Sequence, residues 1–489
     1  MNAPGEPFVP GGWRELLRIA GPLVVSMASF TLMQFVDRVF LAHYGAAAFQ
    51  AALPAGTLSF TLISFFHALA GYAGAFAAQY HGAGNPVGGA RATAQGLWLT
   101  LASAPLMWAL IPAGRWGMAV AGHPPEVLGE ENIYFTILMV GGVIVTLNGA
   151  LSGFFNGRGD TRAVMRATVV GNAVNLALDY AMIFGRWGFP RLGIAGAAWA
   201  TIAGGATTAL FLAWRYVGIS TQAEYGPRLF GQFDAVLFRR LLRFGTPAAL
   251  HLAMDSGSFA VFVLLTGRLG GVPLAASNMA FSINNIAFQP LLALNMAASI
   301  LVGQYQGRRR YDIAERAGWT ALKAGWLYMG FMGLTFVLFP GAYIGLFGNV
   351  GGDLPREALL RTARPLMGMM AVWGMFDAVN MVLLGALRGA GDTHFAMIYS
   401  TITAWLFWIP GEIALAVWLS RRSASGPLPD WMGGGITPLW GWLTVYVIVL
   451  SVGFWGRFRS GRWKHIRLIE PAPIPRPPRT GAEAPMMAE

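Results

Sequence analysis

At 489 residues the chain is long enough for about three soluble domains, but its composition excludes them. Hydrophobic residues make up 55% of the sequence and charged residues 11%, whereas a soluble domain carries about 25% charged residues. The net charge of +12 does not indicate a nucleic-acid partner, because most Lys and Arg residues fall in alternate loops between hydrophobic segments, which is the positive-inside pattern. The sequence contains no cysteine, which excludes disulfides and thiolate metal sites.

Twelve hydrophobic segments follow in chain order, and a helix of about 20 such residues crosses the hydrocarbon core of a bilayer. The first is too long for a signal peptide, so we expect it to be retained. The run 269–307 lacks a strong turn signal and is interpreted as one helix. With twelve spans, the basic loops and both termini fall on one side, which predicts cytoplasmic termini and a plasma (inner) membrane location. The predicted spans are 15–41, 51–78, 92–114, 132–157, 167–185, 192–214, 244–267, 269–307, 324–352, 365–387, 395–419 and 431–456.

The chain also contains an internal duplication. Gln79-Tyr80 aligns with Gln304-Tyr305 without a gap across the neighbouring residues. Farther on, after a short insertion in the second copy, the loop G-R-G-D-T (157–161) aligns with G-A-G-D-T (389–393). Each copy holds six spans, so both enter the membrane from the same side. The sequence therefore predicts an all-α membrane protein with two six-helix bundles related by a parallel repeat, and a substrate site between them.

The expected domain boundaries follow from this repeat. They are an N-terminal tail at 1–13, a first bundle at 14–225, a cytoplasmic linker at 226–237, a second bundle at 238–458, and a basic, then Pro-rich, cytoplasmic tail at 459–489.

Several motifs carry a family resemblance: Asp37 in the first span, the loop G-A-G-N-P-x-x-G-G-A-R-A (82–92), N-x-x-N-x-x-x-D (172–179), G-I-A-G-A-A-W-A-T (193–201) and F-D-A-V-N-M-V-L-L-G-A-L-R-G-A-G-D-T (376–393). With these the chain resembles the multidrug and toxic compound extrusion (MATE) transporters over nearly its whole length. The resemblance implies a V-shaped monomer with a central cavity in the lipid bilayer. It further implies a secondary active antiporter, not an enzyme, that exchanges small organic, drug-like and mostly cationic compounds for H⁺ or Na⁺ without a cofactor.

Acidic residues within the predicted spans are candidates for function, because a charge at mid-bilayer is costly. Asp179 lies one helical turn from Asn175 on the same face, and Asn172 lies near the next turn. Carboxylate and amide oxygens suit H⁺ or Na⁺ better than a transition metal. The resemblance adds Asp37 and Thr201 to this coupling site. The alternatives are a polar clamp between helices without an ion and, for Asp37, an anchor at the membrane interface.

The second half has its own candidates. Asp255 and Asp377 lie where the NorM-type branch of the family has acidic residues, and Trp373 lies where a tyrosine is expected. We interpret these three residues as a substrate site or a secondary cation site, with structural pairing as the alternative. Glu412 matches no motif and is expected to pair with a neighbouring helix.

There are two alternative function classes. An intramembrane aspartyl protease is disfavoured because Asp160 and Asp392 occupy equivalent loops, where a Gly-Asp-Thr turn suits a helix cap. A flippase for lipid-linked saccharides remains the alternative. Its cavity would need several Arg or Lys residues to bind a pyrophosphate, whereas the charges in the predicted spans are almost all acidic. His67 and His251 are expected to be core histidines without a role.

Overall fold

The computed structural model describes residues 9–220, 232–267, 269, 271–345, 356–424, 426 and 429–470, and this part of the chain contains helices and no strands. Twelve stretches in it are long and apolar enough to cross a membrane, as predicted. The run from residue 271 forms one helix of 37 residues. The first half comprises α1 (Trp13–Tyr44), α2 (Ala46–Gly71), α3 (Ala73–Gly82), α4 (Pro86–Ala109), α5 (Ile111–Val120), α6 (Pro125–Gly157), α7 (Thr161–Phe184) and α8 (Ile194–Ser220).

The second half repeats this order with a few additional short helices. It comprises α9 (Ala235–Gly267), α10 (Gly271–Gly307), α11 (Tyr311–Leu338), α12 (Pro340–Gly345), α13 (Arg356–Ala390), α14 (Thr393–Ile402), the π-helical turn η1 (Thr403–Trp408), α15 (Ile409–Ala424), the 3-10 turn η2 (Asp430–Gly435), α16 (Ile436–Arg459) and the 3-10 turn η3 (Arg462–His465).

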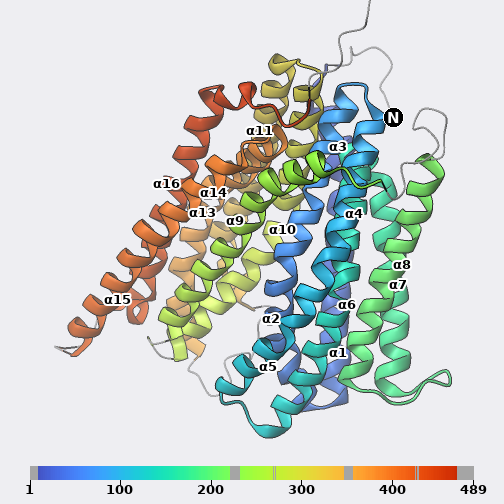
Figure 1. Cartoon of the computed structure of the whole chain (residues 1–489). Helices are drawn as coiled ribbons and strands as arrows, with labels where there is room; N and C mark the ends of the chain where they lie inside the picture. Colours follow the sequence, from blue (N-terminus) through green and yellow to red (C-terminus); the bar gives the residue numbers. More distant parts are fainter. Residues whose placement is uncertain are drawn as a thin grey trace, which may run out of the picture.

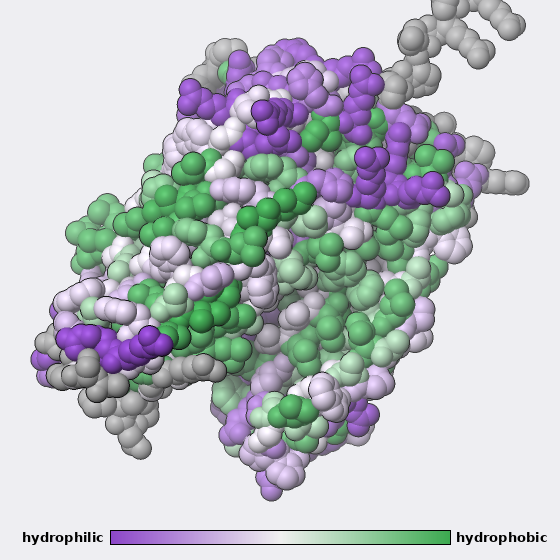
Figure 2. Space-filling model, turned by 60° about the vertical axis from the view of Figure 1, so that its left-hand side comes forward, coloured by the Kyte–Doolittle hydropathy of each residue, from purple (hydrophilic) through white to green (hydrophobic). Residues whose placement is uncertain are grey.

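The two halves form two bundles that meet at one end of the molecule. We call the end of the molecule marked N in Figure 1, where α16 also ends, the terminal end, and the opposite one the far end. Between the halves, α3 and α1 pack against α10, and α2 packs against α9. Toward the far end the bundles diverge (Figure 1), and Figure 2 shows a notch between them at that end. Hydrophilic residues gather at the terminal end, with a broad hydrophobic band below them (Figure 2).

Two glutamines at equivalent positions of the repeat join the halves at the terminal end. The Nε2 atom of Gln79 in α3 donates to the carbonyl oxygen of Gly389 in the second half, 2.9 Å away. The Nε2 atom of Gln304 in α10 donates to the carbonyl oxygen of Gly157 in the first half, 2.8 Å away. Both glutamines are buried. Each bond runs from one half to the other, so the pair closes this end with approximate two-fold symmetry.

Two glycines allow this close approach. A Cβ atom added to Gly82 would overlap the carbonyl oxygen of Gln304, and one added to Gly307 would overlap that of Gln79. Backbones of two helices approach so closely only where small residues line the contact. The repeated motif Gln-Tyr-x-Gly therefore builds the junction between α3 and α10 from both sides.

The two Gly-Asp-Thr turns differ in structure. Asp160 caps α7 as expected, since its Oδ1 accepts from the backbone N–H of Ala163 at 3.3 Å. Asp392 lies at the N-cap of α14 but makes no such side-chain bond. Its carboxylate instead binds Arg457 of α16 through two hydrogen bonds of 2.6 and 3.2 Å. The expectation of a helix cap is thus wrong for Asp392, because a nearby guanidinium offers a stronger, charge-assisted partner.

This difference predicts unequal costs for the same substitution. The Asp392 side chain is 4% exposed, so Asp392→Asn leaves a largely buried guanidinium without its counter-charge and should lower the free energy of unfolding by about 3 kcal/mol. Asp160 is 39% exposed and lies 3.5 Å from Arg215, so Asp160→Asn should cost less than about 1 kcal/mol, since asparagine can still cap the helix. Thermal melting of the two purified variants tests this, and equal melting temperatures would contradict it.

The segment after α16 packs on the bundle before the described chain ends. Trp463 and Leu468 are fully buried, and Gln306 of α10 donates to the backbone oxygens of Trp463, Lys464 and Ile466. The start of the expected tail is therefore folded against the terminal end. Residues 221–231 of the first bundle and expected linker, and the Pro-rich residues from 471 on, lie outside the described residues.

Candidate functional site: acidic clusters and the cavity between the halves

The first-half candidates come together between α1 and α7. The carboxyl groups of Asp37 and Asp179 adjoin, and the Asn175 amide lies beside Asp179. Asp179 and Asn175 are almost fully buried. Both oxygens of Asp179 and both polar atoms of the Asn175 amide nevertheless form no well-directed hydrogen bond with any residue that the structure describes. Such buried, unsatisfied oxygens are costly, and in native proteins each needs a physical explanation.

Close packing of α7 on α8 fixes the position of these side chains. A Cβ atom on Gly171 would come within 2.6 Å of the Gly204 carbonyl oxygen, and one on Gly204 within 2.7 Å of the Asn175 Cβ. Toward the terminal end, the Nδ2 atom of Asn172 donates to the Ser29 hydroxyl of α1 at 2.9 Å. Asn172 thus joins α7 to α1, and Asn175 and Asp179 lie farther along α7.

Two carboxylates in contact cannot both stay charged in a buried site, because like charges repel strongly there. A shared proton or a bound cation removes the repulsion. The tyrosine Tyr134 of α6 also lies near both carboxyl groups, and a phenol can donate to a carboxylate or coordinate a cation. In the described part of the chain, no group of three or more His, Cys, Asp or Glu side chains gathers in a way that would hold a metal ion.

Thr201, the remaining predicted member, forms a hydrogen bond on its own helix. Its hydroxyl donates to the carbonyl oxygen of Ala197 on its own helix, at 2.9 Å. It lies on α8, the helix against which Asn175 packs. Its role as a cation ligand stays a prediction.

The second-half acids lie on two helices. Asp377 of α13 is buried, and its Oδ1 accepts from the Asn380 amide at 3.2 Å. Asp255 of α9 is exposed and interacts electrostatically with Asp377. The buried hydroxyl of Tyr446 in α16 lies near both acids and has no hydrogen-bond partner in the described part of the chain. Tyr446 supplies a phenol in this cluster, which the sequence lacks at position 373.

Trp373 and Glu412 occupy the core of the second half. Trp373 packs edge-on against Phe281 and Trp440, with ring centroids 6.0 and 5.8 Å away. Glu412 of α15 is fully buried, and its Oε2 accepts from the indole of Trp408, at the end of the preceding turn η1, at 3.2 Å. Its Oε1 has no hydrogen-bond partner among the described residues, so the expected pairing with a neighbouring helix is not found there. One turn of helix separates acid and indole, and this local bond is available without another helix.

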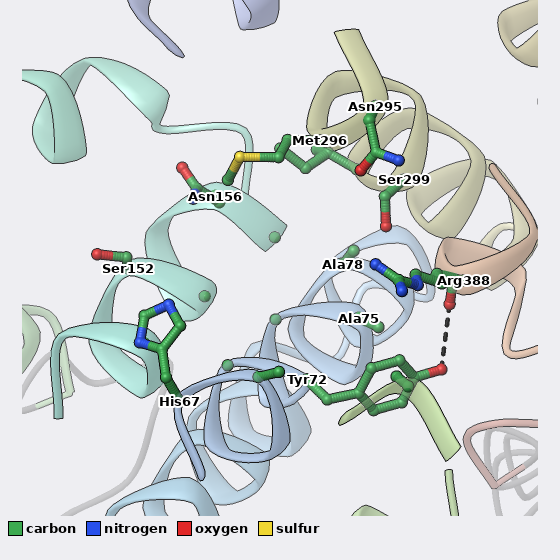
Figure 3. A pocket seen from close by; sticks show the side chains of 18 of the residues that line it. His67, Tyr72, Ala75, Ala78, Ser152, Asn156, Asn295, Met296, Ser299 and Arg388 are labelled. Carbon is green, nitrogen blue, oxygen red and sulfur yellow. Dashed lines mark hydrogen bonds between the residues drawn. The ribbon is translucent and has the colours of Figure 1, made fainter. Parts of the chain in front are cut away.

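A cavity of about 270 Å³ lies between the two halves, just inside the junction of α3 and α10. Its wall on the first half is made mostly of Gly and Ala, with His67, Ser152 and Asn156 among them. The second half contributes Arg388 of α13, whose guanidinium points into this space (Figure 3). A small, partly polar space between two repeats is where a repeat transporter would bind its substrate.

Arg388 belongs to a buried polar chain. Its Nη2 donates to Nδ1 of His251 at 2.9 Å, and Nε2 of His251 lies 2.8 Å from the Ser400 hydroxyl. Its backbone oxygen accepts from the Tyr72 hydroxyl of the first half at 3.1 Å (Figure 3). Because a guanidinium can only donate, Nδ1 of His251 carries the lone pair in this arrangement and the imidazole is neutral. His251 is thus buried, as expected, but it has a defined role in holding Arg388.

Comparison with known proteins identifies the family. The sequence profile of the MatE family matches residues 22–181 and 247–413, one stretch in each half. The chain belongs to the MatE family. Among curated relatives, the probable multidrug resistance protein NorM of Pseudomonas aeruginosa is 30% identical over 468 residues, which cover 94% of this chain and 91% of that protein. The multidrug resistance protein PmpM of the same species is 25% identical and covers 88% and 91% of the two chains.

Solved structures support the fold of this MatE protein. A MATE family multidrug resistance transporter in an outward-facing conformation superimposes with a TM-score of 0.80 at 20% identity, covering 93% of this chain and 97% of that one. A transporter of the same superfamily from Pyrococcus furiosus, described as having a binding pocket of reversed polarity, gives a TM-score of 0.78 at 19% identity and covers 93% and 97%. At these identities the likeness shows the fold.

Three residues of the MatE protein's sites were missed from the sequence: Arg388, Tyr134 and Tyr446. Arg388 lies inside the motif L-R-G-A-G-D-T, just after the predicted span 365–387, where the sequence predicts a loop. The expectation that intramembrane charges are almost all acidic therefore needs correction at the cavity. Tyr134 is one of 13 tyrosines, and nothing in its neighbourhood distinguishes it. Tyr134 becomes a candidate only because the fold brings it close to Asp37 and Asp179.

Proposed function

We propose that this MatE protein is a secondary active multidrug efflux antiporter, which exchanges small organic, mostly cationic compounds for H⁺ or Na⁺. The observation that carries the proposal is the contact between Asp37 and Asp179 inside the first bundle, with unsatisfied carboxylate and amide oxygens around it. Such a site gains most from a proton or a hard monovalent cation. Multidrug resistance relatives in Pseudomonas support organic compounds as substrates.

The terminal end faces the cytoplasm in this proposal, and the protein resides in the inner membrane of a bacterium as a monomer. The basic loops at that end support the orientation. The structure, closed at the terminal end and parted at the far end, is then an outward-facing conformation. The flippase alternative is less well supported, because Arg388 is the single permanently charged side chain among the described residues that line the cavity.

In this proposal, exchange of substrate for cation depends on whether the Asp37–Asp179 pair is charged or neutralised by a bound cation. When Asp37 and Asp179 take up a cation from outside, their repulsion is removed and α1 packs differently against α7. Because α1 also packs against α10 of the second half, such a shift can change the contact between halves and release the substrate. A cation can drive this change only by binding one conformation more tightly than the other. Asp255 and Asp377 attract cationic parts of the substrate or bind a second cation.

Reconstitution into liposomes tests the coupling. An inwardly directed gradient of H⁺ or Na⁺, imposed alone, should drive export of a cationic dye at least about tenfold faster than no gradient, as a large population shift requires. The membrane potential is collapsed with an ionophore. Under this condition one of the two gradients should drive dye export, and the other should have no effect on it. Equal dye movement with and without both gradients would refute antiport.

A further inference from the structure

The cavity between the halves has a positive inner wall that the proposed function does not use. The residues that line it carry no acid, and Arg388 is the permanently charged one among those described. In the part of the chain that the structure describes, Arg388 forms no ion pair within 4.0 Å, and its Nε is buried without an acceptor. Its recorded side-chain acceptor is the neutral His251. A guanidinium has five N–H donors in a fixed fork, which matches a carboxylate.

The surroundings of Arg388 provide both space and further hydrogen-bonding groups. In Figure 3 the guanidinium points toward the wall of α3 and α6, with Ser299 beside it and Asn156 across the cavity. The Oδ1 atom of Asn156 is buried and accepts no hydrogen bond from any described residue. Gly74 and Gly153 line the opposite wall, where α3 and α6 pack so closely that a Cβ atom on Gly74 would come within 2.8 Å of the Gly153 Cα. The cavity of about 270 Å³ lies below the roughly 300–1,000 Å³ of whole drug sites, and so fits one end of a molecule.

A negative charge lies on the same helix face, nearer the far end. Ala248 and Leu252 of α9 line the cavity. Asp255 follows three residues after Leu252, so it lies on the same face about one turn farther out. It is exposed, and Arg388 interacts with it electrostatically at a distance beyond an ion pair. Along the cleft, charge therefore changes from positive at the inner end to negative farther out.

We propose that Arg388 forms an anion subsite that binds the carboxylate of a zwitterionic substrate, while Asp255 attracts the cationic part of the same molecule. This inference rests on the proposed function for the identity of the ligand as a transported compound. His251 is a positioning residue, because its Nδ1 lone pair holds the guanidinium and its other nitrogen is fixed by Ser400. The repeat supports a specific role. Arg388 occupies the position at which the first half has Asn156, so the charge is not part of the duplicated scaffold.

Two fluorescent dyes that differ in one group provide the test. Rhodamine 110 has a free carboxylate beside its cationic ring system, and rhodamine 123 is its methyl ester. Binding to the purified full-length protein is measured by fluorescence polarisation. Arg388→Gln should weaken rhodamine 110 binding at least about tenfold, as expected for the loss of a charge-assisted pair. Rhodamine 123 binding should change less than about twofold, and Arg388→Lys should retain part of the carboxylate preference. Arg162→Gln, at an exposed position of α7, is the matched control.

The native protein gives a second measurement that does not depend on a folded variant. Benzoate should compete with rhodamine 110 and leave rhodamine 123 bound. Equal loss of both dyes in Arg388→Gln, or no loss of either, would overturn the subsite. Stronger competition by a short-chain phosphatidylglycerol than by benzoate would assign the guanidinium to a lipid headgroup and also overturn it. If the proposed antiport fails in liposomes while the two dyes still differ in these assays, the subsite stands and the transport mechanism does not.

Discussion

Replacing Asp179 with asparagine should abolish cation-driven efflux while the protein remains folded in the membrane. Asparagine has nearly the same shape but can neither take up a proton nor neutralise a bound cation. Asp37 would then face an amide, so the repulsion that a cation relieves would be lost. The gradient could no longer favour one conformation over the other. We expect dye export from liposomes to fall to the rate without a gradient, a loss of at least about tenfold.

The matched control for this variant is Asp312→Asn. Asp312 is an exposed acid in the first turn of α11, and its carboxylate pairs with Arg310 at 3.1 Å in solvent. Removing that charge changes the net charge of the protein by the same amount but should leave efflux within about twofold, since exposed ion pairs contribute little. Full gradient-driven efflux in Asp179→Asn would show that the cluster is a polar clamp between α1 and α7. Substrate binding that persists in Asp179→Asn without efflux would separate coupling from recognition.

The sequence predicts the scaffold of this site well and its contacts poorly. Charge-free runs of about 20 residues are enough to place the spans, because lipid tolerates few alternatives. The repeat places Gln79 opposite Gln304 in an alignment. It does not indicate that each glutamine bonds the other half, because that contact depends on how two bundles dock. The sequence also does not predict where a membrane-spanning helix is interrupted. The second span divides into α2 and α3 between Gly71 and Ala73, although the sequence there is as apolar as elsewhere.

The sequence is least able to predict a side-chain contact when the two residues lie on different helices. Asp179 and Asn175 are predictable together, because a spacing of four residues fixes their neighbourhood. Tyr134 and Tyr446 are not, since each reaches the acids from a distant part of the chain. Arg388 shows a further difficulty. A motif that repeats in both halves is attributed to the scaffold, and a single residue that departs from the repeat is easily overlooked. Positions at which the two copies of the repeat carry different residues, such as Arg388 and Asn156, are where the two halves differ in charge and hydrogen bonding.

Closure of the terminal end should fail when Gly82 is replaced by leucine. The added side chain would occupy the position of the Gln304 backbone, and backbone cannot move aside as a flexible side chain can. The halves would have to separate at this end, which breaks the bonds from Gln79 to Gly389 and from Gln304 to Gly157. The protein should then stay open at the terminal end. Without alternation between two conformations, we expect gradient-driven efflux to fall at least about tenfold.

The absence of cysteine makes this conformation measurable in the native background. A single Ser299→Cys substitution places a thiol in the cavity, and a membrane-impermeant maleimide is added from the terminal side. Labelling should be slow in the otherwise native chain and at least about tenfold faster with Gly82→Leu, if the closed state dominates by more than about 1.4 kcal/mol. Gly456→Leu is the control, because a Cβ there meets no atom within 4 Å. Removing only the hydrogen bonds, with Gln79→Ala and Gln304→Ala together, should give an intermediate rate. Unchanged labelling in Gly82→Leu would mean that the α3–α10 junction does not govern access to the cavity.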